Sequence, residues 1–180
     1  MIDHNNGPSM EPGGTWRTQC WTAARKALVP HLPIEVLRGR LRRAADLGLD
    51  YRTYAGIRAT TGRDIVAVLF SSNALKMRKG QLQVSAETAQ KLEQVLAERI
   101  GLATAPVRPQ DMLQAVHFAY AIAAPFAFTP FAVQRTALRA ALGSVPSDQA
   151  ILVGAYSAEA EWCAAARLAG YVPAATFFGR

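Results

Sequence analysis

Residues 63–80 read RDIVAVLFSSNALKMRKG, and the interpretation of the whole chain depends on how this stretch folds. Its first part, Arg63–Phe70, is apolar from Ile65 onward and predicts a largely buried helix. The polar pair Ser71-Ser72 interrupts the run, and the basic segment Asn73–Lys79 is long enough for only one or two helical turns. Because Gly80 follows as a stop signal, the pattern predicts a helix, a turn and a short basic helix. One uninterrupted buried helix over residues 63–79 is the alternative.

A further helix signal follows this stretch. Ser85 is a favourable N-cap residue, and apolar residues then recur at helical spacing as far as Ile100, before Gly101. Residues 63–100 show a partial resemblance to lambda-repressor-like helix-turn-helix domains: the segment MRKGQLQVSAETAQKLEQVL resembles the second half of such a domain, in which a basic residue and a glycine end the recognition helix and a Ser-x-Glu-Thr helix follows. The matching residues here are Lys79, Gly80, Ser85, Glu87, Thr88, Leu92 and Leu96. The chain departs from that pattern in the turn, where Ser71-Ser72 replaces the usual glycine.

This resemblance implies a protein that binds DNA. The residues placed at the major groove or its phosphates are Ser71, Ser72, Asn73, Lys76, Arg78 and Lys79. Upstream, Arg38, Arg42 and Arg43 are candidates for additional phosphate contacts, although arginines that fan around one helix cannot all reach one duplex. The alternative interpretation is that both groups are solvated charges on helix surfaces.

The remainder of the N-terminal half also predicts helices. They are expected within residues 15–30, over residues 33–47, and over residues 51–59 with Asp50 as the N-cap. Residues 1–14 are rich in Gly, Pro and Asn and lack the basic and apolar regions of a signal peptide, so we expect a flexible leader.

The middle of the chain contains a stretch that is long enough to cross a bilayer. Residues 112–134 carry no formal charge, but Pro125 and Pro130 interrupt them and alanine dominates. Thr129 followed by Pro130 is typical of a helix start. We therefore expect two packed helices that meet near residues 125–129, with no membrane partner. Residues 102–110 are the best candidate for a linker.

The C-terminal residues predict a β-α-β unit. Its parts are a strand at Ala150–Val153, a helix from Ser157 to Ala169, and a strand at Val172–Phe178. The segment from Ile151 to Ser157 is similar to a haloacid-dehalogenase-type segment, in which an Asp after the Gly holds magnesium. Ala155 stands in that place and the chain has no Asp-x-Asp motif, so a catalytic enzyme of that type is not indicated. The helix N-terminus at Gly154–Ser157 is still a possible anion site.

Composition limits the other kinds of chemistry. The net charge is +7, and it is uneven: residues 1–105 hold 15 Lys and Arg against 9 Asp and Glu, whereas residues 106–180 hold 5 against 4. A basic half indicates an anionic partner. Two cysteines, Cys20 and Cys163, suit a reducing compartment, and with three scattered histidines they show no metal-ligand spacing. His117 and Cys163 are more typical of core residues than of catalytic groups, so neither an enzyme nor a cofactor is indicated.

These observations predict a mainly α fold: a multi-helix bundle with a possible helix-turn-helix and a small C-terminal β-α-β element. Residues 15–105 would form a basic helical module, and residues 106–180 a neutral Ala-rich module that supports a homodimer. The leading hypothesis is a cytoplasmic, bacterial-type, DNA-binding transcriptional regulator. The alternatives are an adaptor or anti-regulator that binds an acidic protein, and a ligand-binding or degenerate enzyme domain that uses the Gly154–Ser157 turn.

Overall fold

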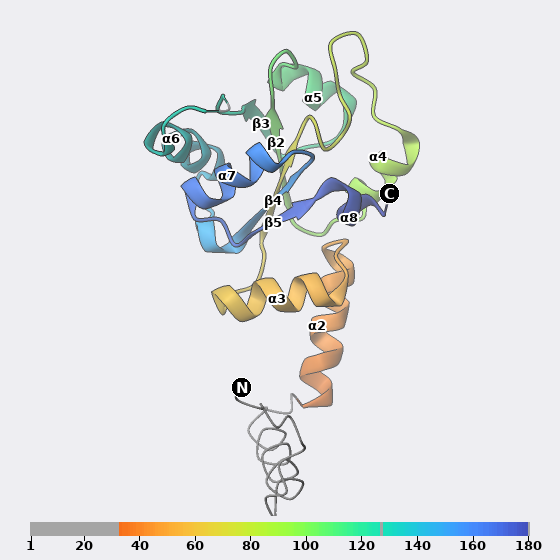
Figure 1. Cartoon of the computed structure of the whole chain (residues 1–180). Coiled ribbons are helices and arrows are strands. Elements are labelled where there is room, and N and C mark those ends of the chain that lie inside the picture. The colour runs from red at the N-terminus through yellow and green to blue at the C-terminus, as the bar shows by residue number, and fades with distance from the viewer. Residues whose placement is uncertain (1–32, 127, 180) are drawn as a thin grey trace, which may run out of the picture. The chain divides into compact units, whose positions relative to one another are not determined.

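The computed structural model describes residues 33–126 and 128–179. Residues from Arg38 onward form one unit that is built on a single parallel β-sheet (Figure 1). The described part of the other unit, residues 33–37, contains the start of helix α2. The expected leader, the helix expected within residues 15–30, and Cys20 all lie outside the described residues.

The sheet has five strands in the order β3-β2-β1-β4-β5, and every neighbouring pair is parallel. In chain order the strands are β1 (Ala67–Ser71), β2 (Glu98–Ala103), β3 (Tyr120–Ala123), β4 (Ala150–Gly154) and β5 (Gly170–Pro173). The helices are α2 (Ile34–Asp46), α3 (Tyr51–Thr61), α4 (Ala86–Glu93), α5 (Pro109–Ala115), α6 (Phe131–Leu142), α7 (Ser157–Ala166) and α8 (Ala174–Phe178), with a short 3-10 turn at Ser147–Gln149.

The prediction of a mainly α bundle is therefore wrong, because the fold is an α/β arrangement around a parallel sheet. The error began at Arg63–Phe70, whose apolar run belongs to central strand β1 and not to a helix. A strand that is buried on both faces shows a continuous apolar run, which periodicity alone does not distinguish from a buried helix. No helix occurs between Thr61 and Ala86, so neither the two helices expected over residues 63–79 nor the single-helix alternative is present.

Two further segments differ from the expected helices. The helix that starts after Ser85 ends at Glu93, and the residues expected to continue it to position 100 lead into β2. Gly101, expected to stop a helix, is a strand residue whose added Cβ would lie 2.8 Å from the Cβ of Ala121 in β3. The uncharged residues 112–134 are divided among α5, β3 and the start of α6. Within the part of the chain that the structure describes, no helix is long and apolar enough to cross a membrane.

Several local predictions are confirmed. The Asp50 carboxylate accepts the N–H of Thr53 at 3.0 Å and caps α3, and the Ser85 hydroxyl accepts the N–H of Thr88 and caps α4. The C-terminal β-α-β unit is present as β4, α7 and β5, although β5 ends at Pro173 and α8 (Ala174–Phe178) replaces the rest of the last expected strand.

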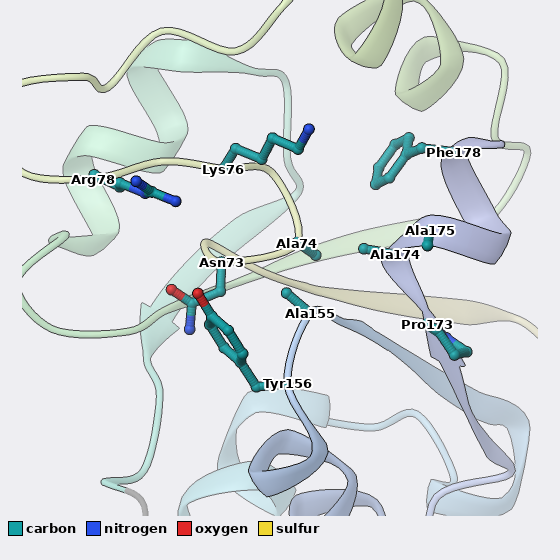
Figure 2. Close-up of a pocket in the computed structure, with 10 residues that line it drawn as sticks. All are labelled: Asn73, Ala74, Lys76, Arg78, Ala155, Tyr156, Pro173, Ala174, Ala175 and Phe178. Carbon is teal, nitrogen blue, oxygen red and sulfur yellow. The ribbon is translucent and has the colours of Figure 1, made fainter. Parts of the chain in front are cut away.

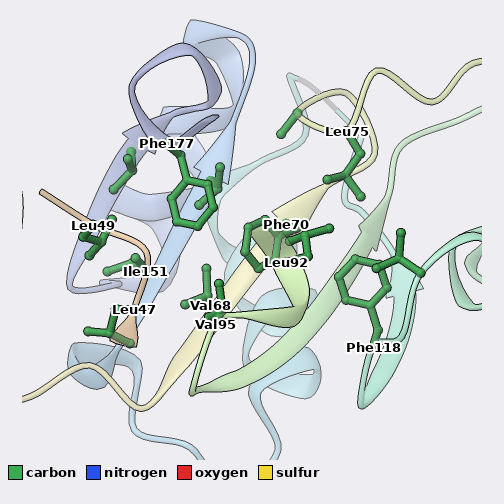
Figure 3. Close-up of a cluster of buried hydrophobic side chains, with 14 of the residues drawn as sticks. Leu47, Leu49, Val68, Phe70, Leu75, Leu92, Val95, Phe118, Ile151 and Phe177 are labelled. Atoms are coloured by element: carbon green, nitrogen blue, oxygen red, sulfur yellow. The ribbon is translucent and has the colours of Figure 1, made fainter. Parts of the chain in front are cut away.

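The core has two layers, one on each face of the sheet. Side chains alternate along each strand, so Val68 and Phe70 of β1 face one layer while Ala67 and Leu69 face the other. The first layer contains buried residues of α2, α3, α4, α5 and α8. The ring centroids of its Phe70 and Phe177 lie 5.4 Å apart, and both side chains are drawn in Figure 3. The second layer contains buried residues of α6 and α7.

This layering follows from the order of the strands. The chain moves from β1 outward through β2 to β3, then returns to the other side of β1 for β4 and β5. Because crossovers between parallel strands are right-handed, reversing the direction of travel places the later crossover helices, α6 and α7, on the opposite face. All strands end at the same edge, and the winding reverses between β1 and β4. Ligands of such sheets bind in the crevice at this reversal point.

Candidate ligand-binding site

Two buried serines lie at the reversal point, where Ser71 is the last residue of β1 and Ser72 begins the loop that follows. Ser71 and Ser72 are both fully buried. The Ser71 hydroxyl accepts the N–H of Ala74 at 3.0 Å. The Ser72 hydroxyl pairs with the Thr104 hydroxyl and accepts the Thr104 N–H at 3.0 Å, which ties the loop to the end of β2. These predicted DNA-contacting serines therefore hold the loop in place and have no exposed surface.

The cations of the same loop are on the outside. Lys76, Arg78 and Lys79 are exposed. Lys76 has a positive φ of 59°, and the Arg78 and Gln81 backbones exchange hydrogen bonds of 3.0 and 2.9 Å, so that Lys79-Gly80 forms the tip of a hairpin. The basic segment is thus a turn and a hairpin.

A buried carboxylate lies directly beside this loop. Glu159 of α7 is only 3 % exposed. One of its oxygens accepts the N–H groups of Ala155 and Tyr156 at 2.6 and 3.1 Å, and the other accepts the side-chain amide of Asn73 at 3.0 Å. Hydrogen bonds of this kind compensate a buried charge for its lost hydration. They also mean that an internal carboxylate already occupies the helix N-terminus that the sequence suggested as an anion site.

The position before that helix requires a glycine. A Cβ added to Gly154 would lie 2.6 Å from the bonded Glu159 oxygen and 2.7 Å from the Tyr171 ring. The Tyr171 hydroxyl donates to the Tyr156 carbonyl at 3.0 Å. Burial, and then the charge of Glu159, raise the pKa of Tyr171, so this hydroxyl stays protonated as a donor. Gly154 therefore allows β4, α7 and β5 to meet closely at this edge.

A pocket of about 460 Å³ opens at the carboxyl ends of β1, β4 and β5. We call it the cationic pocket; its lining consists of Asn73, Lys76, Arg78, Tyr156 and Phe178 together with four alanines and a proline. Figure 2 shows Asn73 and Tyr156 together at one end of the pocket and Phe178 at the other end. The volume lies within the usual range for small-molecule sites.

The charged side chains described in the lining of the cationic pocket are all positive. Lys76 and Arg78 line it, and no Asp or Glu is among the described residues that do so. The nearby Glu159 carboxylate is directed to its three donors. A pocket with two cations, an apolar wall and an amide favours an anion that carries some apolar surface.

The described residues at this edge offer no catalytic arrangement. The Ser71 and Ser72 hydroxyls are engaged as above, and no His or Cys is among the described residues that line the cationic pocket. Elsewhere, His117 is exposed, not a core residue as expected. Burial raises the pKa of Cys163 to about 11, which leaves its thiol protonated and unreactive. Over residues 33–126 and 128–179, no group of three or more His, Cys, Asp or Glu is placed to hold a metal.

Arg43 of α2 bonds to residues near the amino ends of the strands, away from the cationic pocket. Arg43 donates to the Asp64 carboxylate at 2.9 Å and to the carbonyls of Ile65 and Leu96 at 2.6 and 3.0 Å. These acceptors precede β1 and β2 at the amino edge of the sheet. Ile65 is six residues before Ser71, which is about 20 Å along an extended chain. Arg38 and Arg42 are exposed on the same helix. The structure therefore does not bring Arg43 together with the loop cations.

Sequence reasoning identified part of this site and missed the rest. Lys76 and Arg78 were selected, but for contact with DNA. Phe178 and Glu159 are not among the site residues predicted from the sequence, and Tyr156 is included only as part of the Gly154–Ser157 turn. A carboxylate three residues after a helix N-cap is a recognisable capping signal, and it could have identified Glu159 as an internal ligand of the backbone.

Comparisons of the chain with protein-family models, with curated protein sequences and with solved structures found no match.

Proposed function

We propose that this chain is a ligand-binding domain that holds a small organic anion in the cationic pocket without transforming it. The observation that carries the proposal is the placement of Lys76 and Arg78 on a pocket at the reversal point of a parallel sheet, with no acidic residue in its described lining. This is the ligand-binding alternative that the sequence suggested, moved from the α7 N-terminus to the loop after β1.

The absence of reactive groups in the described lining favours binding over catalysis. The buried hydroxyls have structural partners, and both oxygens of the Glu159 carboxylate accept hydrogen bonds from protein donors. Such a domain would respond to its ligand through the loops that surround the pocket, which come from three different strands.

The test is calorimetric titration with inorganic phosphate, acetate and small dicarboxylates at low salt. We expect binding that Lys76→Ala combined with Arg78→Ala weakens by about tenfold or more, since each charge-assisted contact contributes on the order of 1 kcal/mol. The matched control is Arg42→Ala with Arg52→Ala, which removes the same charge from exposed helix positions outside the pocket. Equal losses in both double variants, or consumption of the anion during incubation, would contradict the proposal.

DNA binding by residues 71–79 stays a prediction. The exposed Lys76, Arg78 and Lys79 support it, whereas the buried Ser71 and Ser72 and the lack of a helix between Thr61 and Ala86 do not. A salt titration of duplex DNA binding tests it, because phosphate contacts give a steep salt dependence. Binding that is absent at low salt, or unchanged by Lys76→Ala with Lys79→Ala, argues against it. An acidic protein partner and self-association through residues 106–180 likewise stay predictions.

A further inference from the structure

A second pocket of about 350 Å³ adjoins the cationic pocket, and the two share Asn73 and Tyr156. It lies at the carboxyl ends of β2 and β3, beside α7. Four aromatic residues line it, Phe126, Phe128, Tyr156 and Trp162, so we call it the aromatic pocket.

The rings of the aromatic pocket differ in exposure. Trp162 is 3 % exposed and forms a fixed wall from α7, whereas Phe126 and Phe128 are 71 % and 91 % exposed. Large aromatic side chains left in water beside a hollow gain free energy when a flat apolar group covers them. Phe128 also has a φ of 67°, a left-handed backbone that a bulky residue rarely adopts and that is typical of binding sites.

The polar groups of the aromatic pocket orient a ligand. Glu159, the carboxylate at this pocket, lies toward the boundary shared with the cationic pocket, where it binds Asn73. Glu159 would repel the charged group of an anionic ligand from the aromatic pocket. Lys76 and Arg78 would attract that charged group into the cationic pocket, on the other side of Asn73 and Tyr156. The two pockets therefore favour opposite ends of one molecule.

We propose that the ligand is an aromatic organic anion, with its ring against Phe126, Phe128 and Trp162 and its charged group at Lys76 and Arg78. This inference rests on the proposed function and adds the chemical class of the ligand. The charged group is a carboxylate or a phosphate, since both pair with Lys and Arg.

The experiment compares ligands that differ only by a ring. Phenyl phosphate is titrated against inorganic phosphate, and phenylacetate against acetate, by calorimetry with the full chain. The expected result is that the ring improves affinity by about tenfold or more, which is about 1.4 kcal/mol, in at least one pair. The pair that shows the gain identifies the charged group.

Two double variants test whether this gain in affinity comes from the rings of the aromatic pocket. Phe126→Ala with Phe128→Ala is expected to abolish the benefit of the ring and leave the ring-free anion unaffected. Phe131→Ala with Val133→Ala is the matched control, because both residues are 53 % exposed on α6 and line neither pocket. A ring that adds nothing, or whose benefit survives the loss of Phe126 and Phe128, overturns the inference and leaves the proposed function standing. Failure of every anion to bind overturns both.

Discussion

Replacing Glu159 tests the internal carboxylate that organises the site. Glu159→Ala removes the acceptor for Ala155, Tyr156 and Asn73 and leaves three donors without it. Hydrogen bonds to a charged group contribute about 1.5–3 kcal/mol each. The two backbone donors, however, belong to exposed residues, so water can accept part of the hydrogen bonding that the carboxylate no longer provides. The expected loss of unfolding free energy is therefore about 3–5 kcal/mol.

Glu159→Gln separates the charge of the carboxylate from its shape. The amide keeps one acceptor oxygen for the α7 N-terminus, and Asn73 can rotate to face the new donor, so we expect a smaller loss of about 1–2 kcal/mol. Urea denaturation followed by circular dichroism measures both variants. The control is Glu161→Gln, an exposed carboxylate on the same helix, which should change the free energy by less than about 0.5 kcal/mol. A Glu159→Ala protein as stable as the control would refute this account of the buried carboxylate.

Three further outcomes follow from the packing and the shifted pKa values. Gly154→Ala forces a Cβ against the Glu159 oxygen and should lower the unfolding free energy by about 1–3 kcal/mol in urea; an unchanged midpoint would contradict the close approach. Burial alone would raise the pKa of Asp64, but hydrogen bonds from Tyr54 and Arg43 outweigh it and hold the pKa below its ordinary value. The stabilisation from Asp64 is therefore present above the unfolded pKa and is lost as pH falls through the folded one, so Asp64→Asn should flatten the decline in stability below about pH 4; a parallel decline in both proteins would argue against it. In a Cys20→Ala background, alkylation of Cys163 should stay slow at pH 8 and rise steadily up to its pKa of about 11, and a plateau near pH 8 would show that its thiol is not shielded.

Local signals in the sequence were more informative than the fold-level interpretation. Asp50 and Ser85 were recognisable as helix caps because side-chain oxygens that accept a backbone N–H act within one turn, independently of the fold. The β-α-β unit after Ala150 was recognisable for a similar reason. A polar turn and glycines limit its apolar runs to a few residues. Runs of this length are typical of strands and are too short for helices.

The central strands were missed because of where they lie in the sheet. Residues Ala67–Ser71 are buried on both faces and show no alternation, and the residues before β2 happen to continue a helical spacing from α4. The local sequence does not distinguish a strand from a helix in these two segments. Pairing with strands that are distant in the sequence decides between the two structures.

The candidate site could be predicted only in part for the same reason. Lys76 and Arg78 stand out in the sequence as exposed cations, but their pocket is completed by residues about 80 to 100 positions later, such as Tyr156 and Phe178. Only the strand order brings these segments to one edge. The buried pair formed by Asn73 and Glu159 depends on the same long-range arrangement.

The most direct test of the cationic pocket is a nitrogen-15 amide titration of the full chain with inorganic phosphate and acetate at low salt. We predict saturable chemical-shift changes centred on residues 73–78, 155–156 and 174–178, which disappear in the Lys76→Ala, Arg78→Ala protein. Shifts confined to Arg139 and Arg167, whose pocket includes the residues that precede β4 at the opposite edge, or no saturable shift at all, would contradict it.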